Sequence, residues 1–267
     1  DLILAVGTRL VTSQWLDGQQ VIQIDVDPEE IGRHYDNTMR VEGDAKLTLE
    51  ALLSALASTA PSEKDRTDEV AAQRAQRSED IIKVEPQGEL LNAVRKAVPE
   101  DGIVISGMTQ LGYYARAHYP VYEPRTFITS SYSGNLGYAY PTALGAKVAQ
   151  PDKAVVCLSG DGGFMFNSQE MSTAVAHNIN VVVVVFNDNA YGNVKRDQMN
   201  QFSGRTIGVE LHNPDFVKLA EAYGAKGFVA NGPAELESTL KDALAMDSPV
   251  LIEVPVGPMP SPFFRPS

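Results

Sequence analysis

The segments Gly160-Asp161-Gly162-Gly163 and Asn187-Asp188-Asn189 each follow a short apolar run, residues 154–158 and 181–186 respectively. Continuous apolar runs rich in β-branched residues are typical of strands that are buried on both faces, as in parallel sheets. Residues 167–177, between the two runs, predict a crossover helix. The sequence therefore predicts an α/β fold, with a parallel sheet flanked by helices and both aspartates at the carboxyl ends of parallel strands.

This placement points to a ligand site, because open α/β sheets bind ligands at the carboxyl ends of their strands. Carboxylate oxygens are ligands that Mg²⁺ prefers, and glycines at a helix start expose backbone N–H groups that bind phosphate. Residues 160–164 lack the third glycine of the dinucleotide fingerprint, and no Gly-Lys-Ser/Thr of a Walker loop follows. The sequence therefore predicts a site for a divalent cation and a diphosphate. The alternative is an ordinary βαβ unit whose strands end in aspartate.

Composition limits the function classes. The 267 residues are 43% hydrophobic, as in a globular protein of one or two domains. The 22 basic and 34 acidic residues give a net charge of -12, which argues against nonspecific binding to nucleic acid or anionic membranes. No apolar stretch of about 18 residues predicts a membrane span. The single cysteine, Cys157, excludes a disulfide framework, indicates a reducing cytoplasm, and is expected to be a buried, inert thiol.

The organisation changes along the chain. Residues 1–7 predict a buried strand and residues 21–25 a second strand, and helices are expected from about Glu29 and over residues 46–56. Residues 58–79 are polar and charged, as in a linker with helical character, and a complete α/β pattern begins near Gln87. We therefore expect half of an α/β domain over residues 1–57, a linker over 58–86 and a second α/β domain over 87–267. The proline-rich tail, 255–267, is expected to wrap a surface or stay loose.

The unit over residues 160–194 resembles the cofactor signature of thiamine-diphosphate enzymes, in which Gly-Asp-Gly is followed by a helix, a strand and an Asn-Asn pair. The resemblance to the acetolactate synthase and benzoylformate decarboxylase-like family covers nearly the whole chain. Residues 1–57 resemble the carboxyl half of its Rossmann-like central domain, through the motifs at residues 7–9, 24–32 and 41–45. Residues 87–267 resemble its thiamine diphosphate-binding domain. The family's amino-terminal pyrimidine-binding domain has no counterpart, which implies a carboxyl-terminal portion of a longer enzyme.

The resemblance implies that thiamine diphosphate is held through Mg²⁺. Asp161 matches the first metal ligand, Asp188 stands where the family usually has asparagine, and the backbone carbonyl of Ala190 matches the third. An aspartate should hold Mg²⁺ at least as well as an asparagine. For Asp188 the alternative is a helix N-cap or turn residue. Four residues would bring backbone groups to the diphosphate: Gly162, Gly163, Tyr191 and Gly192.

Two further loops carry the resemblance. In the family, the loop at residues 133–141 holds the aminopyrimidine ring. The carbonyl of Gly134 would accept from the ring's amino group, and Leu136 would prop the cofactor into its bent, self-activating shape. These two positions are the candidate catalytic ones, with a plain core leucine as the alternative for Leu136. The loop at residues 104–111 would contact the diphosphate through Gly107, Met108 and Gln110, although Leu111 replaces the family's histidine.

The reaction implied is decarboxylation, carboligation or both, of a 2-keto acid, as in acetolactate synthase. An aldehyde lyase of the same family is the alternative. Asp197 replaces a tryptophan of the biosynthetic acetolactate synthases, and Val194 replaces a glutamate of yeast-type pyruvate decarboxylases. FAD stays open, because Gly7-Thr8-Arg9 resembles the family's nucleotide region whereas residues 10–13 depart from it.

The family's ring-activating glutamate lies on the absent domain and comes from the partner subunit. The resemblance thus implies a homodimer or homotetramer through the missing pyrimidine-binding domain, an inactive fragment, and a small-molecule 2-keto acid or aldehyde as the binding partner. Two other classes remain open: a noncatalytic regulatory paralogue that binds a Mg-diphosphate ligand, and a flavin- or NAD-binding Rossmann protein.

Overall fold

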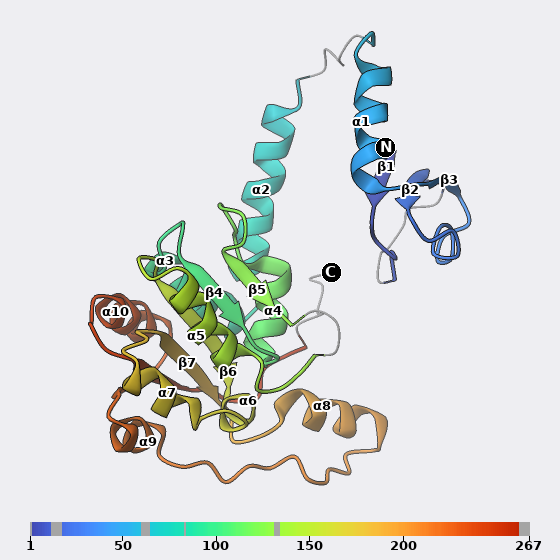
Figure 1. Cartoon of the computed structure of the whole chain (residues 1–267). Helices are drawn as coiled ribbons and strands as arrows, with labels where there is room; N and C mark the ends of the chain where they lie inside the picture. The colour runs from blue at the N-terminus through green and yellow to red at the C-terminus, as the bar shows by residue number, and fades with distance from the viewer. Residues whose placement is uncertain (1, 12–17, 60–64, 83, 131–133, 262–267) are drawn as a thin grey trace. The chain divides into compact units, whose positions relative to one another are not determined.

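The computed structural model describes residues 2–11, 18–59, 65–82, 84–130 and 134–261. The chain divides into two compact units, Asp1–Asp68 and Glu69–Ser267, each with its own parallel sheet (Figure 1). None of the helices in the described part of the chain combines the length and the apolar character that a membrane span requires.

The first unit contains a three-stranded parallel sheet in the order β1-β2-β3. Its elements are β1 (Ile3–Val6), β2 (Val21–Asp25), β3 (Thr38–Glu42) and α1 (Ala45–Leu56). The side chain of Asp44 caps α1 by accepting from the backbone N–H of Leu47 at 3.0 Å. Both predicted strands and the predicted helix over residues 46–56 are confirmed. The predicted burial of the first strand is wrong, because only Ala5 of β1 is buried and Leu4 is 44% exposed. Strand β3 was not predicted, because its side chains are only partly buried or exposed and give no apolar run.

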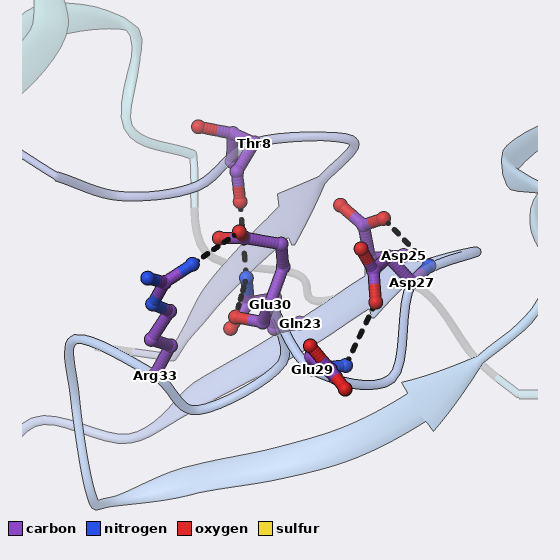
Figure 2. Close-up of polar contacts among 7 residues, drawn as sticks. All are labelled: Thr8, Gln23, Asp25, Asp27, Glu29, Glu30 and Arg33. Atoms are coloured by element: carbon purple, nitrogen blue, oxygen red, sulfur yellow. Dashed lines mark hydrogen bonds and ion pairs between the residues drawn. The ribbon is translucent and has the colours of Figure 1, made fainter.

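The helix predicted from Glu29 is wrong, because these residues form a turn after β2. The carboxylate of Asp25 accepts from the N–H of Asp27 at 3.0 Å, and that of Asp27 accepts from the N–H of Glu29 at 2.9 Å (Figure 2). Aspartates that bind backbone groups two residues ahead favour turns over helices. Gly32 then adopts a φ of +77°, which ends any helical path.

Gln23 joins this turn to the loop that follows β1. Its side chain is 2% exposed, and its Nε2 donates to the carbonyls of Thr8 at 3.0 Å and Glu30 at 3.3 Å (Figure 2). Its Oε1 accepts from the N–H of Gly32 at 2.9 Å. A single buried amide therefore satisfies backbone groups of two loops at the carboxyl end of this sheet.

The second unit contains a six-stranded, all-parallel sheet in the order β5-β4-β6-β7-β9-β8. Its strands are β4 (Ile103–Ser106), β5 (Phe127–Thr129), β6 (Val155–Gly160), β7 (Val182–Asn187), β8 (Lys226–Val229) and β9 (Val250–Pro255). In β6 and β7 every residue but the last is buried. The predicted α/β fold with a parallel sheet is confirmed.

The helices from α2 onward follow the expected α/β alternation. They are α2 (Thr67–Ile82), α3 (Gln87–Ala97), α4 (Gln110–His118), α5 (Ala139–Ala149), α6 (Asp161–Met165), α7 (Glu170–Ala176), α8 (Gly192–Gln201), α9 (Phe216–Tyr223) and α10 (Pro233–Leu244). The crossover between β6 and β7 consists of two short helices, α6 and α7, where one was predicted.

Helices cover both faces of the six-stranded sheet (Figure 1). Helices α3, α4 and α10 pack with Val182, Val184 and Phe186 on one face. Helices α5, α7 and α9 pack with Val183 and Val185 on the other. Successive valines of β7 thus serve opposite cores, as the two-residue period of a strand requires, which explains why the run is apolar without alternation.

The strand order places a topological switch point between β4 and β6. From β4 the chain continues to β5 on one side, whereas from β6 it continues to β7 on the other. The two connections leave the sheet in opposite directions and open a crevice at the carboxyl ends of these strands, where α/β proteins bind ligands. The loop of residues 107–109 and the segment beginning at Asp161 border this point.

Candidate functional site

A cavity of about 240 Å³ lies at the switch point, lined by residues that follow β4, β6 and β7. Every site residue predicted from the sequence lines it except Gly107. These residues are Met108, Gln110, Gly134, Leu136, Asp161, Gly162, Gly163, Asp188, Ala190, Tyr191 and Gly192. Segments separated by more than fifty residues in the sequence therefore converge on one cavity.

Gly107 directly follows β4 and is buried against the neighbouring strand β6. Its N–H donates to the carbonyl of Leu158 at 2.8 Å, and a β-carbon there would lie 3.2 Å from the β-carbon of Ala139. The glycine permits close packing of β6 and α5 against the loop after β4. Its contact with a diphosphate stays a prediction.

Asp161 is the first residue of α6 and is 2% exposed. Burial raises the pKa of its carboxyl group, and the negative charge of Asp188 raises it further. Hydrogen bonds from the side-chain amide of Asn213 and the N–H of Gly162 lower the pKa and offset part of this increase. A buried carboxylate facing a second carboxylate is an unfavourable arrangement unless a cation joins it.

Asp188 follows β7, and burial raises the pKa of its carboxyl group as well. Nε2 of Gln110 lies 3.4 Å from Oδ2 of Asp188, and this hydrogen bond lowers the pKa. Arg196 in turn donates from Nη1 to Oε1 of Gln110, which orients the amide. Asp188 is not a helix N-cap, because α8 begins at Gly192 with Tyr191 as its N-cap residue.

Two glycines of the site have no side chain in the space that neighbouring side chains occupy. A β-carbon on Gly192 would lie 2.3 Å from Oδ2 of Asp188 and 2.5 Å from Nε2 of Gln110. A β-carbon on Gly162 would lie 2.5 Å from the ring of Tyr191. Helix α8 has no side-chain hydrogen bond at its N-cap, so its first N–H groups remain available for an anion.

The donor set suits a hard divalent cation. Asp161, Asp188 and Ala190, of which Ala190 is 6% exposed, all line the cavity and could offer two carboxylates and a backbone carbonyl. Oxygen ligands of this kind are those that Mg²⁺ prefers. Among the described residues, no cluster of three or more histidine, cysteine, aspartate or glutamate side chains offers another metal site. The residues therefore fit a Mg²⁺ ion together with an anion at the start of α8.

Leu136 lines the cavity and is 37% exposed, so the alternative of a plain core leucine is wrong. Its loop contains two positive-φ glycines, Gly134 at +62° and Gly137 at +79°. The amide of Asn167 donates to the carbonyl of Gly137 at 2.7 Å and ties the loop to the segment after α6. Ser133, which opens the sequence motif, lies outside the described residues.

Several residues of the site were not predicted from the sequence. Asn213 contacts Asp161, and Arg196 contacts Gln110. Met259, 5% exposed, lines the cavity from the tail, and the next carbonyl, of Pro260, accepts from Gln87 at 3.0 Å. The described part of the tail thus packs on the domain, while residues 262–267 lie outside the described residues. No local motif marks these contacts, because each joins segments distant in sequence.

The second unit is a doubly wound α/β domain, and its switch point carries two carboxylates and a helix start lined by glycines. These features define a class of domain that binds a diphosphate-bearing cofactor. Residues 107–254 match the family model described as thiamine pyrophosphate enzyme, C-terminal TPP binding domain. Residues 1–52 match that of the thiamine pyrophosphate enzyme central domain. The chain belongs to the thiamine pyrophosphate enzyme family, and the resemblance found in the sequence is confirmed.

Similar curated proteins include two acetolactate synthase large subunits. That of Haemophilus influenzae is 35% identical over 92% of this chain, and the isozyme 3 large subunit of Escherichia coli is 34% identical over 91%. A Pseudomonas aeruginosa protein named "Probable 2-ketoarginine decarboxylase AruI" is 33% identical over 95% of this chain. The chain spans about half the length of these relatives, 45%, 45% and 46% respectively.

Proposed function

We propose that the protein binds thiamine diphosphate through Mg²⁺ and decarboxylates a 2-keto acid, with or without ligation of the product to a second carbonyl compound, as an acetolactate synthase-like enzyme. The observation that carries this proposal is the convergence of Asp161 and Asp188 on one cavity beside the uncapped start of α8. When bound, thiamine diphosphate supplies the electron sink that such decarboxylations need.

In this proposal the protein's own groups bind and orient the cation and the cofactor. Asp161, Asp188 and the Ala190 carbonyl hold the cation, and the diphosphate is held by backbone groups of Gly162, Gly163, Tyr191 and Gly192 together with Gly107, Met108 and Gln110. The carbonyl of Gly134 accepts from the aminopyrimidine ring. Leu136, exposed to the cavity, would support the cofactor with its apolar side chain and exclude water.

The cavity of about 240 Å³ is smaller than typical ligand pockets of roughly 300–1,000 Å³. This supports a site completed by another part of the protein, in our proposal a pyrimidine-binding domain that brings the activating glutamate from a partner subunit. We also propose a homodimer or homotetramer, and a cytoplasmic enzyme because Cys157 is a free, buried thiol. We assign residues 1–57 to half of the central domain, 58–86 to a linker and 87–267 to the cofactor domain.

The substrate class rests on the pocket wall and on the relatives. Val194, 49% exposed, adds an apolar side chain to the cavity, which suits the carbon chain of a 2-keto acid. The relatives' names differ in substrate, so we propose the 2-keto acid class only. No feature of the described residues favours the aldehyde lyase or the noncatalytic paralogue. FAD stays open, because residues 12 and 13 of the relevant segment lie outside the described residues.

The test is CO₂ release by the full-length protein from a panel of 2-keto acids of increasing chain length, with Mg²⁺ and thiamine diphosphate each present or omitted. We expect release from at least one substrate only when both are present, and none from Asp161→Ala. Release that does not depend on thiamine diphosphate would contradict the proposal, as would tight cofactor binding without turnover of any 2-keto acid.

A further inference from the structure

The segment after α8 folds back along the loop that follows β7. The N–H of Tyr191 donates to the carbonyl of Val209 at 2.8 Å, and the N–H of Leu211 donates to the carbonyl of Asn189 at 2.8 Å. An antiparallel bridge joins Ala190 to Glu210 between these two bonds. This pairing brings Asn213, two residues after Leu211, to the ends of β6 and β7.

The side-chain amide of Asn213 reaches three oxygens there. Its Nδ2 donates to Oδ2 of Asp161 at 2.6 Å, to Oδ1 of Asn187 at 2.9 Å and, more weakly, to Oδ1 of Asn189 at 3.3 Å. The bond to the carboxylate is short, as expected for a charged acceptor. One amide group therefore ties the residue after β6 to the loop after β7.

The loop after β7 is otherwise held by a few specific contacts. Asn189 has a φ of +54°, a backbone conformation that costs energy for most residues and that asparagine tolerates best. Its N–H donates to Oδ1 of Asn187 at 3.1 Å, and Nδ2 of Asn187 donates to Glu253 of β9 at 2.7 Å. Because Glu253 accepts from Nδ2 of Asn187, Oδ1 of Asn187 faces Asn189 and Asn213.

Both candidate cation ligands are held by neutral side-chain amides, Asp161 by Asn213 and Asp188 by Gln110. An amide fixes a carboxylate without cancelling its charge, whereas an arginine or lysine in its place would oppose a cation. We infer that Asn213 is a positioning residue of the metal site, which pre-aligns Asp161 with the Asp188 loop for a divalent cation. This inference rests on the proposed function, because it presumes that Mg²⁺ binds here.

The experiment measures, in the full-length protein, the Mg²⁺ concentration that gives half-maximal binding of thiamine diphosphate. Groups that orient metal ligands typically change metal affinity 10–100-fold, so Asn213→Ala should raise this concentration about 10- to 100-fold. At saturating Mg²⁺ the cofactor affinity should return close to wild type. Asn213→Ser, which keeps a short donor, should give an intermediate shift.

The matched control is Asn180→Ala, which removes a 2.5 Å bond from Asn180 to Asp247 just before β7 begins, at the opposite end of the sheet. It should leave the Mg²⁺ requirement unchanged, and both variants should melt within a few degrees of wild type without ligand.

An unchanged Mg²⁺ requirement in Asn213→Ala overturns the inference. So does a loss of affinity that is equal at all Mg²⁺ concentrations or that accompanies unfolding. If Asp161→Ala abolishes binding in the same assay, the proposed function survives that outcome, whereas a wild-type protein that binds no Mg-thiamine diphosphate removes both.

Discussion

A β-carbon on Gly192 would lie 2.3 Å from Oδ2 of Asp188, so the carboxylate occupies the space that any other residue's side chain would need. Gly192→Ala should displace Asp188 and Gln110 and lower Mg²⁺-dependent affinity for thiamine diphosphate about 10-fold or more. Calorimetric titration measures this. Gly145→Ala in α5 is the control, because nothing lies within 4 Å of a β-carbon there. Equal affinity for thiamine diphosphate in Gly192→Ala and Gly145→Ala would contradict the expected role of Gly192 in leaving space for Asp188.

The buried carboxyl of Asp161 makes stability depend on pH. Burial raises its pKa in the folded state, so the ligand-free fold binds this proton more tightly than the unfolded chain does. The stabilisation is fully present below the unfolded pKa and is lost as pH rises through the raised folded pKa. Asp161→Asn should therefore raise the melting temperature of the ligand-free protein by a few degrees at neutral pH.

The same substitution should have a smaller effect on the melting temperature near pH 4, because the raised pKa leaves wild-type Asp161 more protonated in the fold there than at neutral pH. It should also abolish stabilisation by Mg²⁺ and thiamine diphosphate together. Thermal melts of wild type and variant at both pH values, with and without ligands, check this. A variant less stable than wild type at neutral pH would mean that the ionised carboxylate stabilises the ligand-free fold.

Cys157 should be unreactive in the folded protein. It is fully buried within β6, and burial raises the pKa of its thiol far above the usual range. A thiol reagent such as iodoacetamide, at pH 8, should modify it only after denaturation, because the thiolate is the nucleophile. Mass spectrometry of native and urea-unfolded samples measures the difference. Rapid labelling of the native protein would place Cys157 in a region that opens readily.

Gln23 should contribute to the stability of the first unit. Gln23→Leu keeps the volume but leaves the carbonyl of Thr8 and the N–H of Gly32 without their partner. The carbonyl of Glu30 loses one of its two bonds and keeps the one from the N–H of Arg33 at 3.3 Å. Leaving buried polar groups unpaired typically costs about 1–3 kcal/mol each, so we expect a clearly lower unfolding midpoint in urea. Gln73→Leu, on an exposed position of α2, should change stability by less than about 0.5 kcal/mol. Similar midpoints for both variants would contradict this.

The parts of the fold that depend on a local sequence pattern could be predicted from the sequence. Strands β6 and β7 are recognisable because a strand buried on both faces must be continuously apolar, and the glycines beside Asp161 mark the site. The helix expected from Glu29 failed because the side chains of Asp25 and Asp27 bind the backbone of a turn. Strand β3 was missed because its partly exposed residues carry no apolar run.

Most of the candidate site was also predictable, since its glycines and carboxylates sit at strand ends. Asn213 was not, because it follows Asp161 by 52 positions and becomes a neighbour only through the pairing of residues 209–211 with the loop after β7. Arg196 and Met259 were missed for the same reason. Contacts made by backbone pairing or by a returning tail leave no local pattern in a single sequence.

The central claim is that Asp161 and Asp188 hold thiamine diphosphate through Mg²⁺. The most direct measurement is calorimetric titration of thiamine diphosphate into the full-length protein, with and without Mg²⁺, alongside Asp161→Ala. We predict binding that requires both the metal and Asp161. Binding of equal strength without Mg²⁺ or in Asp161→Ala, or no binding at all, would contradict the claim.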